Sequence, residues 1–316
     1  MHRPLTVMSA LMAGLAVVAG IGLIVDDRTL LDTSVWTKSL KFAVSFAVYG
    51  LTLAVLVPRL RRARRTAWWL GTLFAATAVV DVGFIALQAA RGTYSHFNTN
   101  TDPVNAIGQT VFTSGVLGMF GVSLVIAVLL LVQRVGDAAL TRALRAGLLL
   151  ATAGMAVAFA IAGAGARRTV PDAYGRPVTL AGAHGVGSPD GAGMPLTNWS
   201  TTGGDLRVPH FVGLHSIQVL VLVAVGLAIL ARRVPRLRDE RLRARLTGVA
   251  VLVCAGVFAI TTWQAFRGQS LAAPDTATLA AAGVLVLLAG GATAVALSRP
   301  GAPAAPAPAP PAPAAG

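Results

Sequence analysis

The chain of 316 residues is 55% hydrophobic and only 12% charged, with a mean hydropathy of +0.71. These values exclude a water-soluble protein of this size and predict an all-α, polytopic transmembrane helical bundle in the lipid bilayer. The formal net charge of +14 would suggest nucleic acid in a soluble protein. Here the basic residues lie in clusters between apolar runs, as membrane topology requires, so nucleic acid is excluded as a partner.

Apolar runs in chain order predict about eight spans, each close to the ~20 residues that cross the hydrocarbon. The first run, 5–25, is interpreted as a helix and not as a signal peptide, because it exceeds an apolar core of about 7–15 residues and lacks a small-x-small cleavage site. The seven further runs are 39–58, 68–90, 107–133, 146–166, 210–231, 246–266 and 278–298. The transmembrane domain is thus 1–298, and the Pro/Ala-rich tail 299–316 is expected to be a disordered cytoplasmic extension.

Arginine placement predicts the orientation of these spans. The alternate loops 59–67, 134–145 and 232–245 hold five, three and seven arginines. Alternate loops share one side of the membrane, and the positive-inside rule makes that side the cytoplasm, with both termini cytoplasmic and the protein in the plasma membrane. The long glycine-rich loop 167–209 then faces outward, and we expect it to form a cap over the outer face.

A short motif recurs at the ends of the third and seventh spans, as QAARG at 88–92 and QAFRG at 264–268. These spans run in the same direction and lie four spans apart, which predicts two tandem four-helix repeats related by an axis along the membrane normal. Under this scheme the second span matches the sixth, and Lys41 corresponds to His210. The alternative is a chance recurrence in a chain rich in alanine, arginine and glycine.

Polar residues align on one face of five spans and face towards the outer half, with Asp81 about 15 Å below Arg91, near mid-membrane. An ionisable group in hydrocarbon costs roughly 2.5–3.5 kcal/mol, so such residues are functional candidates. The aligned sets are Lys38, Lys41, Ser45, Tyr49 and Thr52; Thr77, Asp81, Gln88 and Arg91; Gln109 and Thr113; His215 and Gln218; and Thr261, Gln264 and Arg267. The inner halves are almost purely apolar, so the sequence predicts a water-accessible, cationic pocket that opens outward. Interface anchoring by the cations and interhelical bonding by the glutamines are the alternatives.

Within this pocket the residue types suggest two roles. We expect His215, Asp81 and Tyr49 to be catalytic, with Asp81 relaying a proton. We expect the anionic part of a substrate to be bound by Lys38, Lys41, Gln88, Arg91, Gln218, Gln264 and Arg267.

The histidines allow a metal site but do not form a metal motif. His210 and His215 are five residues apart, about 140° around a helix, so they cannot converge as an i,i+4 pair does. Together with His96 and Asp205 they could still hold a divalent metal at the outer surface. The chain has no HExxH and no CxxC. Haem is the poorer expectation, because only one span has histidines within it. His2 and His184 are expected to be incidental.

Several longer motifs resemble a family of proteins. They are KSLKF, QAARGTYSHFN, NWSTTGGDLRVPHFVGLHSIQ and WQAFRGQS, within residues 36–270. They resemble an uncharacterised family of multi-pass bacterial integral membrane proteins, and this resemblance implies a membrane location but no activity. More distantly, the chain is similar to membrane zinc hydrolases of the alkaline ceramidase type. Their HxxxH is replaced here by His210-x-x-x-x-His215.

Three functions are compatible with this pattern. The first is a membrane-embedded enzyme that acts at the outer leaflet on a lipid-like or small anionic substrate. The second is a transporter or receptor for a small anionic solute, coupled to protons through Asp81; the repeat favours transport, whereas the apolar inner halves oppose it. The third is a structural membrane subunit, whose aligned polar residues would pack against one another.

Overall fold

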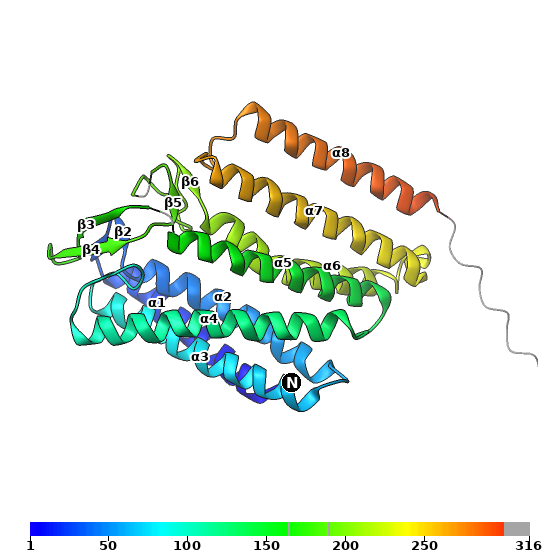
Figure 1. Cartoon of the computed structure of the whole chain (residues 1–316). Helices are drawn as coiled ribbons and strands as arrows, with labels where there is room; N and C mark the ends of the chain where they lie inside the picture. Colours follow the sequence, from blue (N-terminus) through cyan, green and yellow to red (C-terminus); the bar gives the residue numbers. More distant parts are fainter. Residues whose placement is uncertain (164, 189, 300–316) are drawn as a thin grey trace, which may run out of the picture.

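The computed structural model describes residues 1–163, 165–188 and 190–299, so the predicted tail lies outside the described residues from position 300 onward. Within the described residues, eight long helices confirm the predicted all-α bundle (Figure 1). They are α1 (Arg3–Val25), α2 (Trp36–Leu56), α3 (Arg64–Ala90), α4 (Pro103–Leu131), α5 (Ala138–Gly163), α6 (Arg207–Leu230), α7 (Glu240–Phe266) and α8 (Thr276–Ser298). All eight are long and apolar enough to cross a membrane, as expected of a multi-pass membrane protein.

The helices begin two to eight residues before the predicted apolar runs. The reason is that the first turns are polar, and a hydropathy pattern leaves them out although their backbone is helical. The starts of α4 and α8 are fixed by capping aspartates. Asp102 accepts a hydrogen bond from Asn105 N–H, and Asp275 accepts one from Thr278 N–H.

The predicted outer loop 167–209 has secondary structure of its own. Within it β3 (Arg167–Pro171) pairs antiparallel with β4 (Pro177–Ala181), and β5 (Gly185–Val186) pairs with β6 (Gly204–Asp205). A third hairpin, β1 (Thr29–Leu30) with β2 (Thr33–Ser34), precedes α2. The strands gather at one end of the bundle, which we call the cap end, and the arginine-rich turns lie at the other, the arginine end (Figure 1).

The bundle consists of two halves with the same helix packing, α1–α4 and α5–α8. In each half the first two helices pack together, the third packs on both, and the fourth packs on the third. A short 3₁₀ turn links the second and third helices of each half, η1 (Val57–Arg59) and η2 (Pro235–Arg238), and the third helices have 27 residues each. The halves join where α4 packs on α5, whereas α8 lies at the edge on α7 (Figure 1).

The repeated QAxRG motif forms the same structure in both halves. Arg91 pairs with Asp102 at 2.7 Å, and Arg267 pairs with Asp275, so each arginine binds the aspartate that caps the next helix. The glycine that follows each arginine has a left-handed φ, 66° in the first half and 72° in the second. The motif is therefore a helix end that aims the chain into the following helix.

The glutamine of each motif also makes the same bond. Gln88 Nε2 donates to the carbonyl of Tyr94 at 3.4 Å, and Gln264 Nε2 donates to the carbonyl of Ser270 at 2.8 Å. Both acceptors lie six residues further on. A chance recurrence of five letters would not reproduce the capping, the ion pair and this bond together, so the structure favours the tandem repeat.

The hairpins before α2 and α6 are equivalent as well. Val35 N–H donates to the carbonyl of Arg28, and Leu206 N–H donates to that of His184, both at 3.1 Å. In each hairpin the acceptor residue directly precedes the first strand, and the donor residue directly follows the second. Each strand is two residues long. The second half differs by the β3–β4 hairpin, which lies between α5 and β5 and has no counterpart after α1.

This hairpin register corrects the predicted alignment of the two halves. Val35 matches Leu206, so Lys41 matches Val212 and not His210. The prediction was wrong by two residues because it aligned the letters KF and HF, whereas the hydrogen bonds that start the two helices set the true register.

Buried apolar side chains fill the half of the bundle towards the arginine end. The largest cluster joins the ends of α2 and α4 with the beginnings of α1, α3 and α5, and includes Leu5, Leu53, Leu60, Ile126, Leu130 and Leu148. The side-chain bonds between α2 and α6 lie closer to the cap end, where Ser45 meets His215 and Thr52 meets Gln218.

Candidate functional site

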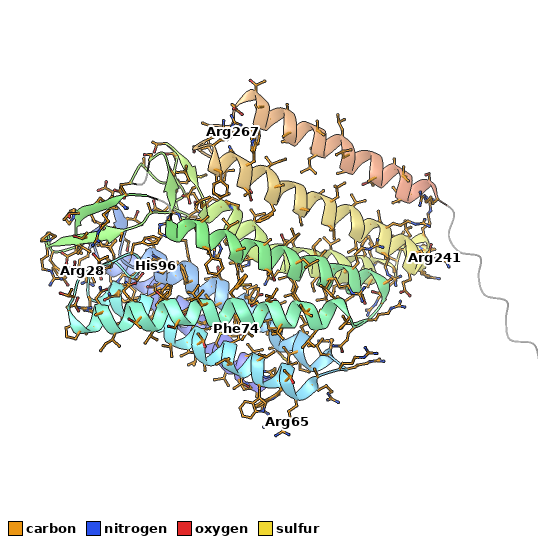
Figure 2. The ribbon with its side chains drawn as sticks, viewed as in Figure 1. Arg28, Arg65, Phe74, His96, Arg241 and Arg267 are labelled. Atoms are coloured by element: carbon orange, nitrogen blue, oxygen red, sulfur yellow. The ribbon has the colours of Figure 1, made fainter. Side chains whose placement is uncertain are left out.

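A group of basic side chains lies beneath the strands at the cap end. This cationic cluster consists of Lys38, Lys41, His96, His184 and Arg207. Two of them start α2, one starts α6, and the two histidines come from the α3–α4 loop and from the turn before β5. Figure 2 shows His96 at the cap end, far from Arg65 and Arg241.

Local structure fixes the cations of this cluster. Lys41 Nζ donates to the carbonyl of Thr197 at 2.6 Å, which ties α2 to the loop before β6. Lys38, one turn closer to the cap, is half-buried and has no hydrogen-bond partner among the described residues. Arg207 Nη2 pairs with Asp205 at 2.6 Å. Three basic side chains, Lys38, Lys41 and Arg207, thus share a single nearby carboxylate.

Asp205 serves this fold as an anchor. Its carboxylate accepts from the N–H groups of Ser200 at 2.8 Å and Arg207 at 2.9 Å, besides the Arg207 guanidinium. Because β6 ends at Asp205 and α6 begins at Arg207, one carboxylate fastens the loop, the strand and the helix start. Its oxygens are fully engaged.

The two histidines of the cluster lie side by side in an aromatic setting. The ring of His96 lies 6.2 Å from that of His184 and 4.5 Å from that of Phe112. Burial, and then the Lys38 ammonium, lower the pKa of His96 well below its ordinary value. Burial, Lys38 and Arg207 lower the pKa of His184 in the same way. Both imidazoles are therefore uncharged at neutral pH.

His184 corrects the prediction that it is incidental. It lies in the stretch AGAHGVG, which has no helical or strand periodicity, so no pattern connected it to the helices. Its only sequence signal is the repeated hairpin, in which it takes the place of Arg28. His2 is not incidental either, since its ring caps α1 and bonds to α3.

Below the cluster a polar seam joins α2 and α6, as the predicted faces implied. His215 Nε2 lies 3.2 Å from the hydroxyl of Ser45, and Gln218 Nε2 donates to the hydroxyl of Thr52 at 3.4 Å. Ser45 is one turn below Lys41, or about 6 Å along the helix. His215 and Gln218 thus belong to the same site as the lysines.

Asp81 lies elsewhere. Its side chain is buried, 2% exposed, and neither carboxylate oxygen has a hydrogen-bond partner among the described residues. It faces Gly115 on α4, where a Cβ would come within 2.3 Å of Oδ1. The rings of Phe84 and Phe112, 6.2 Å apart, occupy the next turn towards the cap and separate Asp81 from His96. Asp81 is therefore not part of the cationic cluster in which the sequence placed it.

Tyr49 is also outside the cluster. It is buried, its ring lies 5.7 Å from that of Phe74, and its hydroxyl has no hydrogen-bond partner in the described part of the chain. It belongs to the apolar core, at a depth between Ser45 and Thr52 on α2.

Four of the predicted substrate ligands are engaged at helix ends. Arg91 binds Gln88 and Asp102, and Gln88 in turn donates to Asn105 at 2.8 Å. The equivalent pair in the second half, Gln264 and Arg267, binds its own turn and Asp275, and Arg267 also stacks on Trp263. These four side chains are therefore engaged in bonds that maintain the repeated helix ends.

The predicted metal ligands do not converge. His96 bonds Ser95, His215 bonds Ser45, and Asp205 bonds Arg207. His210 turns to α5, where Nδ1 lies 2.8 Å from the carbonyl of Gly154. Within residues 1–163, 165–188 and 190–299, no group of three or more His, Cys, Asp or Glu side chains could hold a metal ion.

Comparison with known proteins adds no further constraint on this site. No family model, no curated protein and no solved structure matches the chain. The cluster is therefore interpreted from its chemistry: cations that exceed acids, two uncharged imidazoles, and a serine–histidine contact one turn below.

Proposed function

We propose that the protein is a membrane-embedded enzyme that acts on an anionic, lipid-like substrate at the outer leaflet of the plasma membrane. The observation that carries this proposal is the cationic cluster above the Ser45–His215 contact. In this arrangement the cap end faces outward and the arginine end faces the cytoplasm, in accordance with the positive-inside rule. The first helix then begins, and the last ends, on the cytoplasmic side.

The cluster supports recognition of an anion. Lys38 and Lys41 are half-buried at the start of a membrane-spanning helix, and the one nearby carboxylate is already occupied by Arg207. Desolvated cations without counter-charges are costly, and a phosphate or carboxylate would offset that cost. The uncharged imidazoles of His96 and His184 can donate or accept protons at the same anion.

The seam below supports chemistry on the body of the substrate. With the headgroup at Lys41, a carbonyl about 6 Å deeper reaches Ser45. The Ser45 hydroxyl attacks that carbon while its proton passes to His215 Nε2, and His215 then returns the proton to the leaving alkoxide. Water releases the acyl group by the reverse sequence. His215 is the base and Ser45 the nucleophile, and Lys41 holds the headgroup one turn above them.

A fluorophosphonate reagent tests this proposal directly. We expect Ser45 Oγ to displace fluoride and form a stable phosphonyl ester, detected as a mass increase on the Ser45 peptide. His215→Gln should abolish the label, because the serine loses its base. Ser216→Ala is the matched control, since the Ser216 hydroxyl is bonded to the carbonyl of Val212 at 2.7 Å and has no histidine partner. If Ser45 stays unlabelled in the intact protein, the proposed enzymatic function is wrong.

The lysines provide a separate test of the anion site. Lys38 and Lys41 are the only lysines in the chain, so a water-soluble amine acylator reports on the cluster alone apart from the chain terminus. An alkyl phosphate should slow acylation of these lysines, and the matching uncharged alcohol should not. Equal protection by both ligands would argue against recognition of charge.

Proton-coupled transport of an anionic solute is the second candidate, and Asp81 is the observation that favours it. A buried carboxyl without partners is a proton carrier by default. The closed apolar cluster towards the arginine end opposes transport, because an inward path would need wetting. Uptake of a labelled organic anion into proteoliposomes under a pH gradient, lost in Asp81→Asn, would favour this function over the enzyme.

A further inference from the structure

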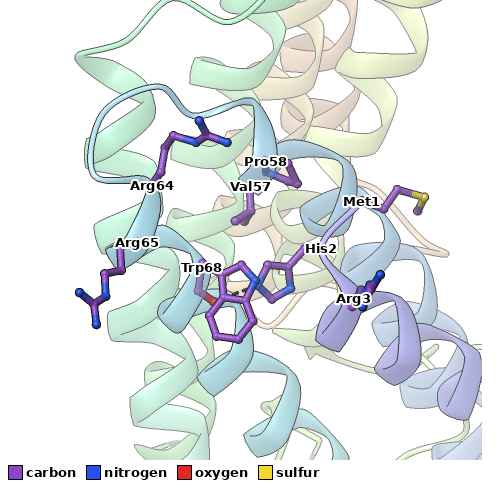
Figure 3. A pocket seen from close by; sticks show the side chains of 8 residues that line it. All are labelled: Met1, His2, Arg3, Val57, Pro58, Arg64, Arg65 and Trp68. Carbon is purple, nitrogen blue, oxygen red and sulfur yellow. Dashed lines mark hydrogen bonds between the residues drawn. The ribbon is translucent and has the colours of Figure 1, made fainter.

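A second polar site lies at the arginine end, on the opposite side of the membrane from the cationic cluster. It is a pocket of about 470 Å³ between the starts of α1 and α3 and the turn η1. Its lining residues are Met1, His2, Arg3, Val57, Pro58, Arg64, Arg65 and Trp68. Figure 3 shows His2 and Trp68 against each other in the pocket, with the arginines around them.

The wall of this pocket is firmly built. His2 Nδ1 accepts from Leu5 N–H at 3.3 Å, so Nε2 carries the proton and donates to the carbonyl of Trp68 at 2.9 Å. The His2 N–H donates to Ala54 O on α2 at 2.8 Å. These bonds join three helices, which fixes the positions from which the arginines extend.

The charges of the pocket have no internal partners. Arg3, Arg64 and Arg65 are exposed, and none of their guanidinium groups takes part in an ion pair or hydrogen bond among the described residues. No acidic residue lines the pocket. Elsewhere at this end arginines do find acids, as Arg243 does with Asp137 at 2.9 Å. Arg232, Arg233 and Arg241 at this end likewise have no ion pair among the described residues, so the pocket is distinguished by bringing three such arginines around one cavity.

The backbone adds donors on the same side. Ala63, the N-cap of α3, has a left-handed φ of 54° and makes no side-chain cap. The N–H groups of Arg64, Arg65 and Thr66 therefore have no acceptor among the described residues, and the first two belong to arginines that line the pocket. Free N–H groups and guanidinium groups together form a site for a tetrahedral oxyanion.

The aromatic residues indicate which anion reaches this site. Trp68 and Trp69 are both exposed on α3 directly after the arginines, as tryptophans are at the headgroup level of a bilayer. An apolar surface therefore continues from the pocket into the membrane. We propose that this pocket binds the phosphate of an anionic phospholipid in the leaflet at the arginine end, with Trp68 against the glycerol region.

Native mass spectrometry of the full chain tests this proposal. Added phosphatidylglycerol should remain bound at one molecule per chain, and phosphatidylcholine should not compete. Replacing the three arginines with glutamine, Arg3→Gln, Arg64→Gln and Arg65→Gln, should weaken retention on the order of 100-fold. All three side chains are exposed, so the variant should keep its fold, and circular dichroism verifies this.

A charge-matched variant distinguishes a pocket from general attraction. Arg232→Gln, Arg233→Gln and Arg241→Gln removes three exposed arginines at the same end but outside the pocket. This variant should retain phosphatidylglycerol within about threefold of the parent chain. Equal weakening in both variants would overturn the site. If millimolar inorganic phosphate displaces the lipid completely, the proposal that a phospholipid is the natural ligand is wrong. Neither result depends on activity at Ser45.

Discussion

The two halves of this bundle share one scaffold, yet only the first places an acid in the middle of its third helix, because the acid of α7, Glu240, lies in its first turn. When Gln88 of α3 is aligned with Gln264 of α7, Asp81 falls opposite Val257. The second half forms the same helix, the same end and the same ion pair with valine at that place. The fold therefore does not require Asp81. Its carboxyl group is buried without a hydrogen-bond partner among the described residues, which lowers the stability of the bundle.

The halves also differ in what they contribute to the cationic cluster. The equivalent helices α2 and α6 face each other across it, the first with two lysines and the second with Arg207 and His215. At the preceding hairpin the first half has Arg28, paired with Asp26, where the second has His184. A repeated scaffold thus became one asymmetric site through changes at matching positions.

The equivalent helix contacts α1–α2 and α5–α6 should respond differently to the same substitution. A Cβ on Gly154 would meet backbone atoms of α6, the nitrogen of Leu214 at 2.7 Å and the Cα of Gly213 at 2.9 Å. A Cβ on Gly50 would meet only side-chain atoms, the end of Met8, which can move, and the hydroxyl of Ser9 at 2.6 Å, which can rotate away from its bond to the Leu5 carbonyl. We expect Gly154→Ala to cost about 3 kcal/mol and Gly50→Ala about 1 kcal/mol of unfolding free energy. Thermal unfolding in one detergent measures both, and equal losses would mean that the halves pack alike.

Replacing Asp81 with the residue of the other half should stabilise the protein. Asp81→Val removes a carboxyl that is buried without partners, and we expect a gain of about 2 kcal/mol in unfolding free energy. Val257→Asp is the reciprocal control and should be destabilising, because Val257 is partly exposed on the lipid-facing surface and a carboxyl there is costly. A loss of stability in Asp81→Val would show that the carboxyl has a structural partner.

The sequence predicted the helices well because each span carries its own signal, an apolar run between polar residues. Cap strands of two residues carry no such signal, and the β3–β4 hairpin lies in a stretch without strong alternation. The site was predicted in part. Helical spacing placed Lys41, Ser45 and His215 on inward faces, but spacing gives no information on which neighbour lies opposite. Asp81 was expected in the pocket for that reason, although an aromatic pair separates it from the cluster.

Anion binding to the cationic cluster should depend on pH, because His96 and His184 can take up protons. His184 is the histidine that replaces Arg28 in the second half. The pKa values of His96 and His184 are lowered in the free site, first by burial and then by Lys38. A bound anion opposes that effect and raises both values, so the complex takes up protons. Affinity should therefore rise as pH falls, by about tenfold per pH unit for each proton taken up.

A short-chain alkyl sulfate is a suitable probe, because its own charge is constant in this range. Isothermal titration between pH 8 and pH 5 measures the slope. His184→Gln should reduce it by the contribution of one proton, and Arg28→Gln, the matching position of the first half, should leave it unchanged. A slope of zero in the parent chain would show that no group of the cluster, imidazole or lysine, takes up a proton on binding.

The repeated helix ends offer the mildest test, a local response to acid that both halves should share. Burial raises the pKa of Asp102, but the Arg91 guanidinium and the Asn105 N–H outweigh it, so the pKa lies below its ordinary value. The pKa of Asp275 is lowered as well, mainly by Arg267. A lowered pKa contributes stability above the ordinary value of about 4, and that stability is lost as pH falls through the lowered pKa. Hydrogen exchange at the first turns of α4 and α8 should therefore accelerate between pH 5 and about pH 2, once corrected for intrinsic rates. Arg91→Gln should shift this response towards higher pH at α4 alone, because it removes the ion pair of one half and leaves Arg267 in place; a simultaneous shift at α8 would mean that the two ends are coupled through the cap.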